Sequence, residues 1–265
     1  MYLFSLKLPI IKKGDSLLKI IIEEIQNSEK NLEDGDIIVI SEKVIATAQG
    51  RVVNLSDVTE ISKKAKKLST KYEMDERIVE LILKESDMIL GGMKHVILTQ
   101  VNDILIANAG IDQSNAGKNN VVLFPINREE IVWKFHKRLK KHFNLKKLGI
   151  IIADSRVQPL RKGTIGIALA TAGFEPVEDC IGKEDLFGRP LEITLRAVAD
   201  DLVSAAQFLL GEADEQTPVV IIRGVNVEFT ENPKMTTEMP VEEDLYMKIF
   251  SKYLRQKANK KDKEI

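Results

Sequence analysis

Short runs of β-branched residues alternate with amphipathic helical patterns along this chain, and this alternation limits the folds that it can adopt. A short apolar run between turn residues predicts a strand, and apolar residues at helical spacing predict a helix with one buried face. The turn residues Asn102 and Asp103 separate two of the runs, which predicts a hairpin. The predicted strands cover residues 37–40, 96–98, 104–106, 149–153 and 219–222.

The helical patterns lie between these strands. Asp15 or Ser16 is expected to cap the first helix, and Gly211 is expected to end the longest one. Because strands and helices do not alternate regularly, the predicted fold class is α+β, with mixed sheets and flanking amphipathic helices. The predicted apolar faces are Leu17, Leu18, Ile21 and Ile25; Val58, Ile61, Ala65 and Leu68; Ile78, Leu81 and Ile82; Ile131, Val132, Phe135 and Leu139; Leu195, Val198, Ala199, Leu202, Val203, Ala206, Leu209 and Leu210; and Leu245, Ile249 and Tyr253.

The chain length predicts one or two domains, since 265 residues are enough for a sizeable hydrophobic core. We expect one domain over residues 1–255. A polar stretch at residues 143–148 offers an alternative division into lobes of residues 1–145 and 146–255. The last residues, 256–265, are almost all polar or charged, and they are expected to form a mobile tail.

The charge balance argues against nucleic acid as a partner. The chain has 39 Lys and Arg residues against 40 Asp and Glu residues, whereas nucleic-acid-binding proteins usually carry a basic excess. A single cysteine, Cys180, gives no sign of an oxidising compartment. No signal peptide or apolar run of about 18 residues is evident, so we expect a cytoplasmic protein without a membrane partner.

The common nucleotide-binding motifs are absent. The chain has neither a Gly-x-x-x-x-Gly-Lys-Ser/Thr loop nor a Gly-x-Gly-x-x-Gly turn after a strand. Any nucleotide must therefore be bound in another way.

Three carboxylates at the ends of strongly apolar segments are the first candidate site. Asp112 follows residues 104–111, Asp154 follows the run 150–153, and Glu212 follows the long helix and its glycine. A carboxylate near a buried element needs a cation or amide donors, and hard divalent cations prefer oxygen ligands. An Asp after a strand is also a common turn residue, so the sequence pattern alone leaves both interpretations open.

A second candidate is the basic segment at residues 154–166. It combines Arg156, Arg161 and Lys162 with the Thr164 hydroxyl and two glycines, a composition that suits an anion. A solvated basic loop would explain the same residues.

Taken together, these segments resemble the coenzyme F420-0:L-glutamate ligase family, the γ-glutamyl ligases that lengthen the tail of coenzyme F420. The similarity extends from near the start of the chain to about residue 228, in matching order and spacing. The matching stretches are residues 35–40, 43–51, 108–115, 154–155, 161–163, 181–189 and 210–212.

The resemblance implies an α+β homodimer that acts as a GTP- and divalent-metal-dependent ligase. In the implied reaction GTP phosphorylates the terminal carboxylate of F420-0, and the amino group of L-glutamate attacks the acyl phosphate to give an amide, GDP and phosphate. Mg²⁺ or Mn²⁺ would screen the charge of the triphosphate, and K⁺ is a further candidate ion.

Site residues follow from the resemblance position by position. The implied metal ligands are Asp112, Asp154, the hydroxyl of Ser155, and Glu212, and the implied catalytic residues are Asp154 and Arg161. The nucleotide would be held by residues 7–10, which include Leu8, Pro9 and Ile10, by Glu42, Lys43 and Asn115, and by residues 210–217, which include Leu210, Gly211, Glu212 and Ala213.

Two departures from the family pattern keep other functions open. Thr47 stands where the family commonly has a lysine. Arg156, Val157 and Gln158 follow the Asp-Ser pair, whereas the family often has its arginine at the position of Gln158. One alternative is an amide ligase of the same fold with a different carboxylate acceptor. The other is a non-catalytic protein that binds a nucleotide or cofactor.

Overall fold

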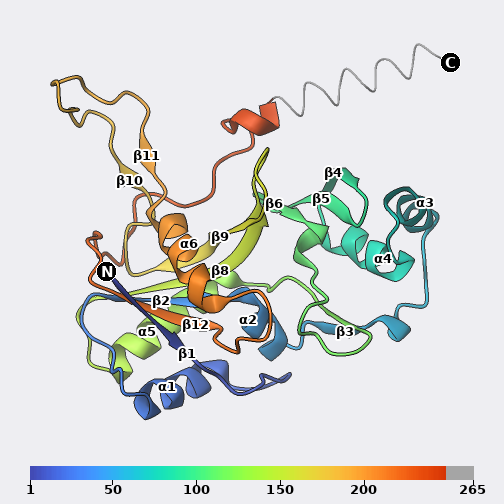
Figure 1. Ribbon diagram of the computed structural model, residues 1–265, viewed down its shortest axis with the longest axis horizontal. Helices are drawn as coiled ribbons and strands as arrows, with labels where there is room; N and C mark the ends of the chain where they lie inside the picture. Colours follow the sequence, from blue (N-terminus) through green and yellow to red (C-terminus); the bar gives the residue numbers. More distant parts are fainter. Residues whose placement is uncertain (249–265) are drawn as a thin grey trace.

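A mixed five-stranded sheet forms the centre of the chain in a computed structural model, which describes residues 1–248 (Figure 1). β2 and β8 are parallel, and the other neighbouring strands are antiparallel. The predicted strands at residues 37–40, 149–153 and 219–222 are confirmed, as is the α+β class. In order across the sheet, the strands are β1 (Tyr2–Leu6), β12 (Val219–Arg223), β2 (Asp36–Ser41), β8 (Leu148–Val157) and β9 (Thr164–Ala172).

Helices cover both faces of this sheet. Successive side chains of a strand point to opposite sides, and because these side chains are apolar, both faces need to be buried. Ile38 and Ile40 of β2 belong to the core that includes α1 (Leu17–Asn27) and α5 (Arg128–His142). Ile37 and Val39 belong to the core that includes α6 (Val198–Leu210) on the other face. Strands that are buried on both faces have continuous apolar sequences, as observed here.

The ends of two helices differ from the sequence prediction. Leu195 lies in β11 (Leu195–Arg196), which pairs with β10 (Glu178–Asp179), so α6 begins three residues later. Neither Asp15 nor Ser16 caps α1: the Ser16 side chain makes no capping bond, and Asp15 Oδ2 accepts the Lys12 N–H at 2.7 Å instead. The predicted end at Gly211 is confirmed, where φ is 69°.

Residues 52–123 form a second packed unit beside the central sheet, at the right of Figure 1, with a hydrophobic core of its own, the second core. The hairpin predicted around Asn102 and Asp103 is confirmed. Val58 and Ile61 lie before their predicted helix, because Ser62 caps it by accepting the Ala65 N–H. The elements are β3 (Val52–Asn54), η1 (Leu55–Asp57), α3 (Lys63–Tyr72), α4 (Glu76–Glu85), β4 (Met88–Met93), β5 (Val96–Val101), β6 (Ile104–Ala107), η2 (Asn108–Gly110) and β7 (Asn120–Val122).

The boundary that the sequence suggested at residues 143–148 falls between α5 and β8, and these two elements share one core. Near the end of the chain, residues 245–248 are helical. Ile249, Tyr253 and the predicted tail at residues 256–265 lie outside the described residues. Within the part that is described, no helix is long and apolar enough to cross a membrane.

A buried ion pair joins the central strands β2 and β12. Asp36 is 0% exposed, and Arg223 donates to both of its oxygens, from Nε to Oδ1 and from Nη2 to Oδ2, each at 2.8 Å. Arg223 also donates to the Asn31 carbonyl at 2.7 Å and pairs with the carboxylate of Glu33. This bidentate pair balances a charge that would otherwise be costly to bury.

We predict that Arg223→Gln lowers the free energy of unfolding by about 3–5 kcal/mol, because it leaves the Asp36 carboxylate buried without a cation. Glu33→Gln is the control and should cost less than about 1 kcal/mol, because the Glu33 side chain is 63% exposed. Urea denaturation measures both values. Equal small losses of unfolding free energy in the two variants would contradict the role of Arg223 as the counter-ion of Asp36.

His136 is a second buried polar group of the core, on α5. It is 1% exposed, packs edge-on against Trp133 at 5.4 Å between ring centroids, and its Nδ1 has no hydrogen-bond partner among residues 1–248. Burial, followed by the positive charge of Lys140, lowers the pKa of His136 below its ordinary value. The imidazole is therefore neutral in the folded protein at neutral pH.

We predict that acidification destabilises the wild type through His136. Because the pKa is lower in the folded state, the unfolded state binds the extra proton as the pH falls below about 6.5, and stability is lost. The melting temperature of the wild type should drop more between about pH 7.5 and pH 5 than that of His136→Gln. His142→Gln, an exposed control on the same helix, should behave as wild type. An identical pH profile for His136→Gln would refute the prediction.

Candidate functional site

The parallel pairing of β2 with β8 brings two acidic residues to one edge of the sheet. Ser41 is in register with Ala153, so the residues that follow them, Glu42 and Asp154, lie side by side. Glu42 begins helix α2 (Glu42–Ala48) and is only 5% exposed. Asp154 does not end its strand, as the sequence suggested, because β8 continues to Val157 in a long hairpin with β9.

Asp112 reaches the same region from the second core. Its backbone exchanges two hydrogen bonds with Val122, at 2.8 and 3.0 Å, which fixes the position of the carboxylate. The side chain accepts bonds from the N–H and hydroxyl of Ser114, and its Oδ2 lies 2.6 Å from the Nζ of Lys43. Lys43 follows Glu42 on α2 and also donates to the Ser114 hydroxyl at 2.8 Å. These contacts tie the second core to the edge of the central sheet.

Glu212 enters from the end of α6, immediately after Gly211. Its Oε1 accepts a bond from Gln207 Nε2 at 2.6 Å and one from the Thr164 hydroxyl of β9 at 3.1 Å. The side chain is exposed and held by neutral donors. Its negative charge is therefore not neutralised by these contacts.

The charges of neighbouring carboxylates act on both Asp154 and Glu42. Burial raises the pKa of Asp154 to about 6; the Ser155 N–H and Lys43 lower it, and the charges of Asp112 and Glu212 raise it. Burial and then the Asp154 charge raise the pKa of Glu42 well above its ordinary value. Burial also raises the pKa of Asp112, but the hydrogen bonds from Lys43 and Ser114, together with the Lys43 charge, lower it below its ordinary value. Negative charge therefore accumulates around Asp154, with Lys43 as a nearby counter-ion.

The chemistry of this donor set fits a hard divalent cation. The oxygens of Asp112, Asp154 and Glu212 are ligands that Mg²⁺ and Mn²⁺ prefer, and a cation would relieve the repulsion around the half-buried Asp154. The side chains are not already arranged as ligands: among residues 1–248, no three His, Cys, Asp or Glu side chains form a group that could hold a metal ion. Binding would therefore require them to move, including a change in the contact between Lys43 and Asp112.

The segments expected to hold a nucleotide contact one another. The Leu8 N–H donates to the Gln216 carbonyl at 3.2 Å, and Asn115 Nδ2 donates to the Ala213 carbonyl at 2.6 Å. Leu8 is buried, whereas Pro9 and Ile10 are exposed beside it. Leu8 and Asn115 thus both contact the segment at residues 210–217, which contains Glu212.

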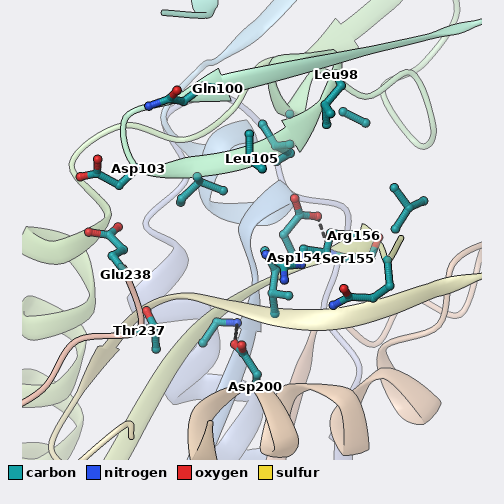
Figure 2. A pocket seen from close by; sticks show the side chains of 18 of the residues that line it. Leu98, Gln100, Asp103, Leu105, Asp154, Ser155, Arg156, Asp200, Thr237 and Glu238 are labelled. Carbon is teal, nitrogen blue, oxygen red and sulfur yellow. Dashed lines mark hydrogen bonds between the residues drawn. The ribbon is translucent and has the colours of Figure 1, made fainter. Parts of the chain in front are cut away.

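A cavity of about 750 Å³ opens beside Asp154 and Ser155 (Figure 2). Its walls come from the β5–β6 hairpin, from β8 and β9, from the first turn of α6, and from residues 237–247. Figure 2 shows Leu98 and Leu105 of the hairpin on one side, Arg156 and Asp200 on another, and Thr237 and Glu238 from the C-terminal segment. The cavity is large enough for a drug-sized molecule.

The basic segment at residues 154–166 is a hairpin, which places Arg156 on β8 and Arg161 in the turn. Arg161 lies exposed in the turn between β8 and β9 and does not line the cavity. Gly166 serves close packing, because a Cβ there would lie 2.5 Å from Cγ1 of Val203 on α6. Gln158 lines the cavity, while Thr47 uses its hydroxyl to donate to the Lys43 carbonyl within α2 at 2.8 Å.

Several cavity residues could not be selected from the sequence. Asp200 reads as one polar position on an amphipathic helix, yet it lines the cavity and accepts the Ala168 N–H at 2.8 Å. Glu238, Met239 and Tyr246 come from a segment whose pattern gives no strand or helix until its end. The only sequence signal for any of these residues was the acidic side chain of Asp200 near the start of the predicted long helix.

The chain is similar over most of its length to proteins of one family. A family model described as F420-0:Gamma-glutamyl ligase matches residues 5–224. A coenzyme F420:L-glutamate ligase of Methanocaldococcus jannaschii is 39% identical over 243 residues, which are 91% of this chain and 95% of that protein. Proteins of the same name are 36% identical in Methanopyrus kandleri, over 82% of this chain and 84% of that protein, and 33% identical in Methanosarcina acetivorans, over 96% of each.

The matched region includes Glu42, Lys43, Asp112, Asp154 and Glu212, and it ends before the C-terminal wall of the cavity. Both the family match and the relatives cover most of the chain. The chain belongs to the F420-0:γ-glutamyl ligase family, a family of amide-bond-forming ligases.

Proposed function

We propose that the chain is a GTP- and divalent-metal-dependent ligase that joins L-glutamate to coenzyme F420-0 through an amide bond. Membership of the family supports the ligase reaction and its substrates. The observation that carries the proposal furthest is the position of Asp154 beside a large cavity, where the charges of both Asp112 and Glu212 act on it. An anionic nucleotide could approach such a group only together with a cation.

The reaction needs an activated carboxylate, because a carboxylate oxygen is a poor leaving group for an attacking amine. GTP would transfer its terminal phosphoryl group to a carboxylate of F420-0, giving an acyl phosphate and GDP. The amino group of L-glutamate would then attack the acyl carbon, forming the amide and releasing phosphate. The buried edge around Glu42 and Asp154 would exclude water, which would otherwise hydrolyse the acyl phosphate.

Asp112, Asp154, the Ser155 hydroxyl and Glu212 would hold Mg²⁺ or Mn²⁺, with K⁺ as a further candidate ion. The divalent cation supplies charge screening for the triphosphate and for the developing charge of phosphoryl transfer. Lys43, freed from Asp112, would provide a second positive charge near the phosphates. Residues 8–10, Asn115 and residues 210–213 would bind the rest of the nucleotide.

We also propose that the enzyme acts as a homodimer. The β10–β11 arm extends from the body at the upper left of Figure 1, and its Leu186 and Phe187 are 99% and 93% exposed. Large apolar side chains at the tip of an arm favour burial against another surface, and a second copy of the chain would supply one.

A different carboxylate acceptor is the second candidate, and it is favoured by Gln158. This residue departs from the family pattern and lines the cavity in which an acceptor would bind. A ligase for another acceptor would keep metal-dependent GTP hydrolysis but would not use F420-0.

We predict that the purified protein, incubated with F420-0, GTP, L-glutamate and Mn²⁺, increases the mass of the coenzyme by one or more glutamyl units. Asp154→Asn should lower the rate by roughly 100-fold or more, because it removes a charged ligand of the cation. Glu60→Gln, at an exposed position between η1 and α3, is the control and should react as wild type. Mass spectrometry detects the product.

The outcomes of this assay separate the candidate functions. GTP hydrolysis that other carboxylic acids stimulate, without a product from F420-0, would indicate a different acceptor. Binding of GTP without turnover of any acceptor would indicate a non-catalytic protein. Either result would contradict the proposed reaction.

A thermal shift measurement tests the metal ligands separately. At about 100 times the dissociation constant, Mn²⁺ with GTP should stabilise the wild type by about 2.7 kcal/mol, or about 5–10 °C. Asp112→Ala and Glu212→Ala should each abolish this shift, because a ligand stabilises only the state that binds it. Glu60→Ala should keep the shift. A full shift in either variant would remove that residue from the proposed set.

A further inference from the structure

Among the described residues that line the cavity beside Asp154, Arg156 is the one cationic side chain. The described residues that line the cavity include seven Asp or Glu residues and a single Arg or Lys residue. A cavity with this lining repels an anion everywhere except near the guanidinium. Any carboxylate that binds inside is therefore expected to bind at Arg156.

The strand geometry directs Arg156 to the place where the proposed reaction occurs. Arg156 follows Asp154 by two positions on β8, so both side chains point to the same face of the sheet. Pairing of Arg156 with Ile165 of β9 fixes the backbone at this position. Figure 2 shows Arg156 beside Asp154 at the floor of the cavity.

The guanidinium has no partner of its own in the described part of the chain. Its Nε is buried and lacks a hydrogen bond, and none of the ion pairs among residues 1–248 includes Arg156. The nearby Asp200 uses Oδ1 to accept the Ala168 N–H and makes no ion pair with Arg156. A buried donor without a partner is costly, so an external acceptor would satisfy it.

Guanidinium groups bind carboxylates through two parallel hydrogen bonds, which fix the orientation of the carboxylate as well as its position. The two substrates that carry a carboxylate differ in size. A volume of about 750 Å³ is far more than glutamate needs, whereas it suits the larger acceptor.

We propose that Arg156 binds the carboxylate of the acceptor that becomes phosphorylated, and that it holds this group next to Asp154. This inference rests on the proposed ligase function and assigns its acceptor site. Arg156 then acts as a substrate-binding residue that selects a carboxylate.

The test is the affinity for F420-0, measured by isothermal titration calorimetry without GTP or metal, in wild type, Arg156→Gln and Arg156→Lys. Arg156→Gln should weaken binding by about 10- to 100-fold, and Arg156→Lys should be intermediate, because it keeps the charge but not the bidentate geometry. Arg138→Gln, an exposed arginine on α5, is the matched control. The KM values for F420-0, L-glutamate and GTP are measured in parallel. If binding is too weak to titrate, the KM for F420-0 in wild type and variants replaces the measured affinity.

An F420-0 analogue whose reacting carboxylate is a carboxamide separates direct contact from a structural role. The analogue should bind weakly to wild type, and Arg156→Gln should weaken it little further. If Arg156→Gln weakens the analogue as much as F420-0, Arg156 contacts another group or acts only through the fold, and the proposal is overturned.

Two further outcomes are decisive. If wild type forms product and Arg156→Gln shows an unchanged affinity and KM for F420-0, or a raised KM for L-glutamate alone, the acceptor assignment is wrong while the ligase function stands. If wild type neither binds F420-0 nor forms product from it, the proposed function fails and the assignment of Arg156 fails with it.

Discussion

The parallel register between β2 and β8 is the constraint on which the rest of the structure depends. Both strands are buried on two faces, and a shift of one residue would turn the side chains of each strand to the wrong core. The register that satisfies both cores pairs Ser41 with Ala153. It thereby brings Glu42 and Asp154 together, so the packing that stabilises the sheet also produces the acidic edge.

The other parts of the candidate site are attached to this edge by specific contacts. The ion pair between Lys43 and Asp112 connects the second core to helix α2, and Glu212 is connected to β9 through Thr164. The resulting group is short of positive charge, because Lys43 is shared among several carboxylates. A cation would relieve this imbalance, so the energetic cost of the site in the free protein supports the proposed binding of a metal–nucleotide complex.

The sequence predicted the elements of the fold better than their junctions. Continuous apolar runs located β2, β8 and β12, because these strands are buried on both faces, and apolar residues at helical spacing located α6, because one of its faces is buried. The helical spacing misplaced the start of α6 at Leu195, because the backbone of that residue pairs with β10, and such pairing leaves no periodic signal. The apolar run also ended a strand at Asp154, because a strand that continues into an exposed hairpin loses its apolar pattern.

The candidate site was only partly accessible to the same reasoning. Local sequence shows that Asp112, Asp154 and Glu212 follow apolar segments, but the resemblance to a family was needed to group them. The cavity wall at residues 237–247 and the role of Asp200 depend on tertiary packing between distant segments. The resemblance implied a catalytic role for Arg161. Among the described residues, however, Arg156 of the same hairpin lines the cavity and Arg161 does not.

The most direct test of the central claim is the position of a bound metal ion. Crystals grown with Mn²⁺ and GTP would give an anomalous difference peak that locates manganese independently of any assumed ligands. The structure predicts a single strong peak about 2.1 Å from oxygens of Asp112, Asp154 and Glu212. A peak bound by other residues, or a bound nucleotide with no metal contact to Asp154, would contradict the account.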